Sequence, residues 1–342
     1  MRSATIDQPV LIHRFVFHGK GKDLFDIFIV NLLRTIATLG IYSFWAKTAT
    51  RKYLWGQSEF AGDRFGYHGT GKELLLGWLK AIILFGGLIA LQSLIRFVDH
   101  PSAKILSEAL FYIGLAFLVP LAQTGSMRYR LSRTSWRGIR FTFRGDYTPF
   151  LWLSLRGYLL TALTLGGYYP YYHCNVRRFM TEHSYFGSTP FMFNGKGKDI
   201  SGIYGSIVGV ALLVSFLAAG AAIWLGLFTL LLLLPALGII QVWFSTKMRR
   251  YYWNQTSFEN CVFECTITTK ELLMLHASNL FYLIITLGMA LPWVKVRTMK
   301  YHLEHLRIQG ALNLEGITQQ AMTAKDAGDQ LGDLLNVDGV FG

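Results

Sequence analysis

The feature that most constrains this chain is a set of apolar runs, each about as long as a helix that crosses a membrane. Hydrocarbon about 30 Å thick needs roughly 20 consecutive apolar residues in a helix. Four runs near that length contain almost no charge: Leu74–Phe97, Ile105–Ala122, Ile200–Ala222 and Leu225–Phe244. The composition agrees, because 52% of the residues are hydrophobic and only 15% are charged. We therefore predict an integral membrane protein with spanning helices in these runs, and a tight turn at Gly220 or Gly226.

Three further apolar runs are interrupted by polar side chains. They cover residues 24–41, 150–167 and 272–291, and they contain Asp26, Asn31, Arg34, Arg156, His276 and Asn279. Polar groups at membrane depth are unfavourable unless they face protein, water or lipid headgroups. We therefore expect these three helices to lie shallow in the membrane or to re-enter it.

A short motif recurs along the chain. The pattern F-x-F-x-G-x-G-K-D runs from Phe15 to Asp23, and variants begin at Phe65, Phe191 and, more faintly, Phe141. The sequence Thr-Leu-Gly occurs at 38–40, 164–166 and 286–288. Recurrence at nearly constant spacing predicts an internal repeat of about two and a half copies. The glycines fit a turn from a strand into a helix better than a phosphate loop, because the spacing differs from that of a Walker motif.

Aromatic pairs flank short turn sequences, as in Phe60–Phe65 and Phe186–Phe191, and the flanking residues alternate with a period of two. These are signals of β-hairpins. The predicted fold class is a helical membrane protein in which each repeat has a shallow helix, a β-hairpin, two transmembrane helices and a second hairpin. We expect the hairpins to form a cytoplasmic β layer, since strand edges cannot face lipid. The predicted regions are an N-terminal tail (1–14), membrane repeat 1 (15–140), membrane repeat 2 (141–262), a partial repeat 3 (263–310) and a disordered acidic tail (311–342).

The distribution of lysine and arginine predicts the orientation. Four connecting segments carry most of the loop charge: Lys47–Lys72, Arg128–Arg144, Arg177–Lys198 and Lys247–Lys270. Loops rich in Lys and Arg stay on the cytoplasmic side. We therefore expect all four segments on that side, with the three interrupted helices not crossing fully.

Four polar residues of the interrupted helices are candidates for a polar membrane site: Asn31, Arg34, Arg156 and Asn279. Asn31 and Asn279 each lie seven residues before a Thr-Leu-Gly turn. Buried amides and arginines need partners or a wet cavity. These side chains therefore either meet one another or bond to local groups and headgroups, and the sequence leaves both interpretations open.

A dense basic segment contains the candidate contacts with anionic headgroups: Arg128, Arg130, Arg133, Arg137, Arg140 and Arg144. Basic residues beside a membrane helix set its orientation and lie next to anionic headgroups, and this explains the dense cluster of arginines. The predicted partners are the phospholipid bilayer and its anionic headgroups, and we expect no binding of nucleic acid.

Three segments resemble the YjgN-like family of bacterial inner-membrane proteins. They are the motif from Phe15 to Asp23, the segment Thr38–Lys47 (T-L-G-I-Y-S-F-W-A-K), and the segment Phe186–Asp199. The resemblance covers about residues 13–310. It implies a multi-pass protein of the inner, cytoplasmic membrane, and it implies no activity, ligand or catalytic residue.

Two classes of function stay open. Glycine-rich helices and polar residues in interrupted helices favour a transporter or channel for a small molecule or ion. The alternative is a membrane-organising or interaction protein whose β layer binds lipid headgroups or a protein partner. We find no catalytic constellation, no metal site and no cofactor motif, so an enzyme is the less favoured interpretation.

Overall fold

The computed structural model describes residues 11–98 and 100–311. Over this range the chain runs five times through the same order of elements: a strand, two helices forming a helical hairpin, and a second strand. A short 3₁₀ turn, η1 (Gly226–Phe228), separates the two helices of the fourth unit. The other elements are β1 (Ile12–Phe17), α1 (Gly21–Ala37), α2 (Ser43–Gly56), β2 (Ser58–Phe60), β3 (Asp63–Tyr67), α3 (Gly71–Arg96), α4 (Pro101–Ser132), β4 (Thr134–Trp136), β5 (Ile139–Phe143), α5 (Tyr147–Leu163), α6 (Tyr169–Glu182), β6 (Ser184–Phe186), β7 (Thr189–Phe193), α7 (Gly197–Leu225), α8 (Thr229–Asn254), β8 (Thr256–Phe258), β9 (Cys261–Cys265), α9 (Thr269–Ile285), α10 (Leu291–Glu304) and β10 (Leu306–Gln309).

The strands form one closed antiparallel barrel in the order β1-β10-β9-β8-β7-β6-β5-β4-β3-β2. The first strand pairs with the last, with Ile12 opposite Gln309. At the junctions with helices, Phe17 lies opposite Ser58 and Tyr67 lies opposite Thr134, and the remaining strand pairs follow the same register. All five helical hairpins therefore leave the same end of the barrel, and the β-turns lie at the other end.

The predicted fold class is wrong. Among the residues that the structure describes, three helical segments are long and apolar enough to cross a membrane: Gly71–Arg96, Pro101–Ser132 and Gly197–Trp224. The described residues therefore do not show the predicted repeat with two transmembrane helices per copy, and the strands close into a barrel instead of forming the predicted β layer. The reason is physical: closure depends on the pairing of β1 with β10, and no local sequence pattern encodes a contact between segments so far apart in the chain.

Aromatic side chains fill the barrel. Successive side chains of a strand point to opposite faces, so the two phenylalanines of each F-x-F motif share one face. Trp136 lies at the centre of this packing, because its ring centroid is 5.3 Å from those of both Phe60 and Phe186. These three side chains are at most 5% exposed. The barrel is thus a packed core, as expected for a barrel of small diameter.

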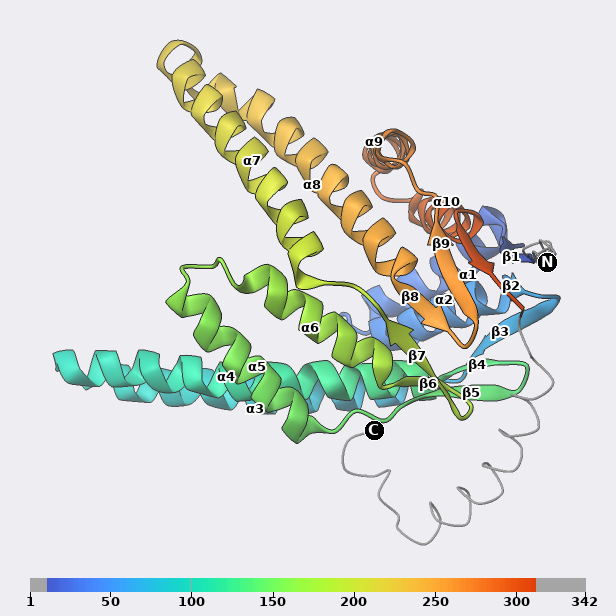
Figure 1. The fold of residues 1–342 in the computed structure, drawn as a ribbon, viewed down its shortest axis with the longest axis horizontal. Helices are drawn as coiled ribbons and strands as arrows, with labels where there is room; N and C mark the ends of the chain where they lie inside the picture. The colour runs from blue at the N-terminus through green and yellow to red at the C-terminus, as the bar shows by residue number, and fades with distance from the viewer. Residues whose placement is uncertain (1–10, 99, 312–342) are drawn as a thin grey trace, which may run out of the picture.

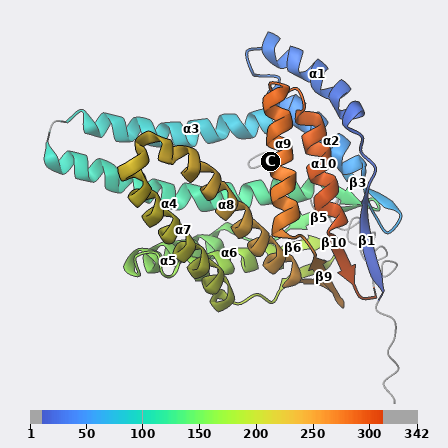
Figure 2. The same ribbon diagram turned by 90° about the horizontal axis from the view of Figure 1, so that it is seen from above.

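The helical hairpins fan out from the barrel in different directions (Figures 1 and 2). The hairpins α3/α4 and α7/α8 project farthest, and apolar side chains such as Ile83 and Phe216 are exposed along them. Positive φ at Gly226, +54°, marks the turn between α7 and α8, at one of the two predicted glycines. Large exposed apolar surfaces of this kind mark a membrane or partner interface.

Tyrosines at the ends of helices join the hairpins to the barrel. The Tyr53 hydroxyl accepts a hydrogen bond from the Lys20 N–H at 2.8 Å, just before α1. Tyr251 makes the same contact with the Lys196 N–H at 2.6 Å, just before α7. The neighbouring motif glycines have a structural role, because a Cβ at Gly19 would lie 2.4 Å from the ring of Phe17.

Two predicted tails fall largely outside the described residues. In the region 1–14, the residues from Ile12 onward belong to β1. The predicted disordered segment 311–342 lies outside the described residues except for Ala311.

Candidate functional site

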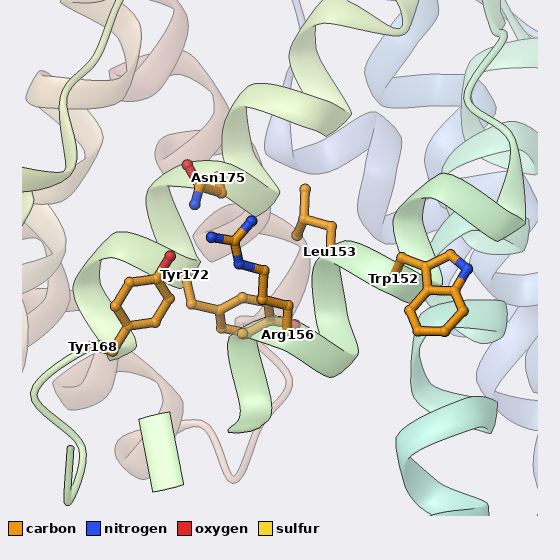
Figure 3. Close-up of a pocket in the computed structure, with 7 residues that line it drawn as sticks. Trp152, Leu153, Arg156, Tyr168, Tyr172 and Asn175 are labelled. Carbon is orange, nitrogen blue, oxygen red and sulfur yellow. The ribbon is translucent and has the colours of Figure 1, made fainter. Parts of the chain in front are cut away.

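A cavity of about 440 Å³ opens between α5 and α6 (Figure 3). Its lining residues are Trp152, Leu153, Arg156, Gly157, Tyr168, Tyr172 and Asn175. One of them, Arg156, belongs to the polar site that the sequence predicted.

Local sequence explains why the cavity forms. The turn between the helices is held by Thr164, whose hydroxyl donates to the Leu160 carbonyl at 2.7 Å and accepts from the Tyr168 N–H at 2.9 Å. Gly157 has no side chain, and the ring of Tyr172 occupies the space beside it. The two helices therefore approach closely at Gly157 and leave room next to Arg156.

Arg156 is an exposed arginine that forms no hydrogen bond or ion pair within the part of the chain that the structure describes. Its guanidinium extends toward Asn175, and Tyr168 and Tyr172 line the same cavity (Figure 3). A guanidinium offers five N–H donors in a planar array that matches the oxygens of phosphate and carboxylate. Together with an amide and phenol groups, it makes the cavity suitable for an anionic group.

Arginines of the other two short hairpins differ from Arg156 because protein groups engage them. Arg34 donates to the Tyr42 hydroxyl at 2.8 Å. Arg297 donates to the Ser278 hydroxyl at 3.2 Å and lies over the ring of Tyr282. Among these three arginines, Arg156 is the one whose guanidinium has no partner among the described residues.

The structure places the four predicted polar residues in three different helical hairpins and does not bring them together. Asn31 and Arg34 lie on α1, Arg156 on α5 and Asn279 on α9. Asn31 is buried, and Asn279 donates to the Thr298 hydroxyl at 3.2 Å, while its side-chain oxygen has no partner among the residues that the structure describes. Their role in function stays a prediction.

Most of the six arginines predicted to contact headgroups have partners inside the protein. Arg133 pairs with Glu73 at 3.0 Å, Arg137 pairs with Asp63, and Arg144 donates to the Gly187 carbonyl at 3.1 Å. Arg128 donates to the Gly145 carbonyl at 3.2 Å, and Arg130 donates to the Ser126 carbonyl at the same distance. Arg140 alone of the six has no partner among the described residues.

A polar cluster that the sequence did not reveal lies where α6, α7 and α8 meet. The hydroxyls of Tyr204 and Tyr252 both lie 3.0 Å from His173 Nδ1. The Arg177 guanidinium lies over the Tyr252 ring, 5.1 Å from its centroid. Burial, and then the nearby charge of Arg177, lower the pKa of His173. His173 and Arg177 lie on α6, Tyr204 lies on α7 and Tyr252 lies on α8. The three segments share no motif, so no sequence signal links them.

No group of three His, Cys, Asp or Glu side chains lies close enough to hold a metal ion within residues 11–98 and 100–311. The sequence predicts neither a metal site nor a cofactor, and both statements stay predictions.

Helices that are long and apolar enough to cross a membrane, with exposed apolar side chains along them, indicate a helical membrane protein. The chain belongs to the family described as "Bacterial protein of unknown function (DUF898)", which matches residues 12–334. This confirms the predicted resemblance.

The chain is also similar to the inner membrane protein YjgN of Escherichia coli K12, with 33% identity over 166 residues. That match covers 48% of this chain and 40% of the relative. The YjgN protein of Salmonella typhimurium LT2 is 33% identical over 153 residues, which are 44% of this chain and 37% of the relative. The chain therefore matches less than half the length of these relatives, and no solved structure matches it. Together with the three apolar helices, these relatives confirm the predicted location, a multi-pass protein of the bacterial inner membrane.

Proposed function

We propose that this protein binds anionic phospholipids of the cytoplasmic leaflet, with the lipid phosphate held in the cavity at Arg156. The observation that carries the proposal is a guanidinium without a partner among the described residues, in a cavity beside apolar surface. The protein would then organise lipids around a barrel on the cytoplasmic side, which is the second of the two functions that the sequence left open.

The surroundings of Arg156 support a position at the headgroup level. Trp152, Leu159 and Leu163 lie on the same helix and are each more than 60% exposed. Such side chains favour contact with lipid, whereas a free arginine at the centre of a bilayer is unfavourable. An anionic headgroup satisfies both conditions, because its phosphate can bind the guanidinium while its acyl chains cover the apolar residues.

The basic residues of the hairpins support an orientation with the barrel on the cytoplasmic side. In each helical hairpin the second helix leads back to the barrel, and its last half carries Lys or Arg. Examples are Lys52 on α2, Arg178 on α6 and Arg250 on α8. Loops with this charge face the cytoplasm. The barrel would therefore lie on the cytoplasmic side, and its adjacent basic residues would meet the anionic leaflet.

The transport interpretation has less support. The barrel interior is filled by side chains such as Trp136 and Phe186. The polar residues that would line a pathway lie in separate hairpins. We therefore favour lipid binding over transport.

Lipid binding can be tested by native mass spectrometry of the purified full chain. The protein is released from vesicles of phosphatidylglycerol and phosphatidylcholine in equal amounts, and the retained lipids are counted for the wild type and for Arg156→Gln. A charged hydrogen bond is worth about 1.5–3 kcal/mol, so we expect a loss of phosphatidylglycerol affinity of roughly 10- to 100-fold.

The matched control is Arg34→Gln, because the Arg34 guanidinium already donates to the Tyr42 hydroxyl and lies over its ring. We expect it to retain phosphatidylglycerol like the wild type. Soluble glycerol phosphate distinguishes the two sources of phosphate: a lipid site resists displacement by it, whereas a site for free phosphate esters releases the lipid. Equal retention by the wild type and Arg156→Gln would contradict the proposal.

A further inference from the structure

The three short helical hairpins end in the same turn. Its sequence is Thr-Leu-Gly, and its leucines are Leu39, Leu165 and Leu287. Each leucine has a φ of +49°, and each following glycine has a φ between +88° and +95°. The leucine side chains are 96%, 97% and 93% exposed, so each one extends away from the protein.

Hydrogen bonds within each turn satisfy its backbone. In the first turn, the Gly40 N–H donates to the Thr35 carbonyl at 2.8 Å, and the Tyr42 N–H donates to the Thr38 hydroxyl at 2.9 Å. The same bonds occur around Leu165 and Leu287, with the same two lengths. In hydrocarbon, backbone groups must find partners inside the protein. The N–H groups of these turns meet that condition, because each one from Thr38 to Ser43, and at the equivalent positions of the other two turns, has an acceptor within its own hairpin.

An exposed leucine with positive φ is unfavourable in water on two counts. The left-handed conformation is strained for an L-residue with a side chain, and glycine or asparagine adopts it more readily. The apolar side chain would also stay hydrated, although its burial would be favourable. Three such leucines at equivalent turns indicate surroundings in which an apolar side chain is favoured.

The lengths of the helices argue against full crossing. The first helix of each short hairpin has 17 residues and the second has 14. At 1.5 Å per residue these are about 26 and 21 Å long, less than the roughly 30 Å of hydrocarbon. The α3/α4 hairpin is longer. Its far end carries the ion pair Arg96–Glu108 and the helix cap at His100, and such polar groups are favourable in an aqueous environment.

We propose that the three Thr-Leu-Gly turns are re-entrant tips that end inside the hydrocarbon of the cytoplasmic leaflet, with Leu39, Leu165 and Leu287 in contact with acyl chains. Leu165 lies nine residues beyond Arg156, about 14 Å along a helix. A tip in the hydrocarbon is therefore compatible with Arg156 at the headgroups. The proposal does not depend on lipid binding at Arg156.

Cysteine accessibility tests the depth of the tips. Leu39→Cys, Leu165→Cys and Leu287→Cys are treated with a membrane-impermeant maleimide in sealed spheroplasts and in inverted vesicles. Ser102→Cys, at the far end of α3/α4, and Ser188→Cys, in the turn between β6 and β7, mark the two sides. The natural cysteines are buried, and the background labelling of these cysteines is measured on the unsubstituted chain.

We expect Ser102→Cys to react only from outside, Ser188→Cys only from inside, and the three tips from neither side. A spin label at residue 165 in phosphatidylglycerol vesicles should then be more accessible to oxygen than to a water-soluble nickel complex. Reaction of the tips from outside would mean that the hairpins cross. Reaction from inside would place the hairpins in the cytoplasm. A spin label that oxygen cannot reach would mean that residue 165 is buried in protein. Each of these three results overturns the proposal.

Discussion

Gly157 lies so close to the ring of Tyr172 that a Cβ at residue 157 would be 2.1 Å from the Cδ2 atom. Asn31 and Asn279 hold the corresponding position, seven residues before the turn, in the other two short hairpins. In the fifth unit the residue that corresponds to Tyr172 is the smaller Val294, and Asn279 donates to the Thr298 hydroxyl. Glycine at residue 157 therefore goes together with the large tyrosine ring across from it.

Gly157→Ala should destabilise the protein. Overpacking of this kind typically costs about 1–3 kcal/mol, and the displaced Tyr172 ring should also weaken binding at Arg156. The control is Gly77→Ala in α3, where a Cβ has open space and alanine favours the helix by up to about 1 kcal/mol. Thermal unfolding in identical nanodiscs measures both, and equal midpoints for the two variants would contradict the close packing.

Trp136→Ala should be among the most damaging substitutions in the barrel. The side chain is 5% exposed, and its Nε1–H donates to the Asp63 carbonyl at 3.2 Å. Removing a buried tryptophan typically costs about 3–5 kcal/mol. Trp152→Ala, which removes a side chain that is 69% exposed, should change the unfolding midpoint much less. A comparable shift in both variants would mean that the aromatic packing of the barrel contributes little.

Stability should fall with acid below about pH 6.5, in part through His302. Burial, followed by the charge of Arg249 and the neighbouring His276 and His305, lowers the pKa of His302 to about 4. Arg249 Nη1 donates to His302 Nε2 at 2.6 Å, which requires a neutral acceptor. Between pH 6.5 and 4, the unfolded chain binds a proton that the folded protein does not, so the free energy of unfolding decreases as the pH falls.

The variant His302→Gln lacks this titration. Its unfolding midpoint should therefore decline less than that of the wild type between pH 7 and pH 4.5. Parallel curves for the two proteins would show that His302 does not cause the loss.

The three natural cysteines should resist alkylation in the folded protein. Cys174, Cys261 and Cys265 are at most 2% exposed, and burial raises the pKa of each thiol. The thiolate is the reactive form, so both access and ionisation oppose the reaction. Intact-mass measurement after maleimide treatment at pH 7 should show no adduct before denaturation and three adducts after it. Adducts on the folded chain would indicate local opening at one of these sites.

Local features could be predicted from the sequence. The turn between Phe60 and Asp63 follows from the aromatic alternation and Gly62, whose φ is +85°. The apolar runs in α3, α4 and α7 follow from their length and composition. These properties depend on residues within one short segment, so pattern and propensity are sufficient.

Properties that join distant segments could not be predicted. The strand Ser58–Phe60 has three residues, too few to show which strand it pairs with. Arg156 was identified as polar within an apolar run, but the opening beside it depends on Gly157 and Tyr172 in two different helices. Predicting the cavity would have required the packing of α5 on α6, which no spacing rule gives.

The pairing of β1 with β10 also fixes an order of assembly. On the ribosome β1 is made long before β10, so the barrel stays open until every helical hairpin has been synthesised. Until then the strands already made form an open sheet with unpaired edges, and such edges are prone to pair with other chains. A chain that stops before β10 cannot close the barrel and keeps β1 and β9 as the two edges of an open sheet.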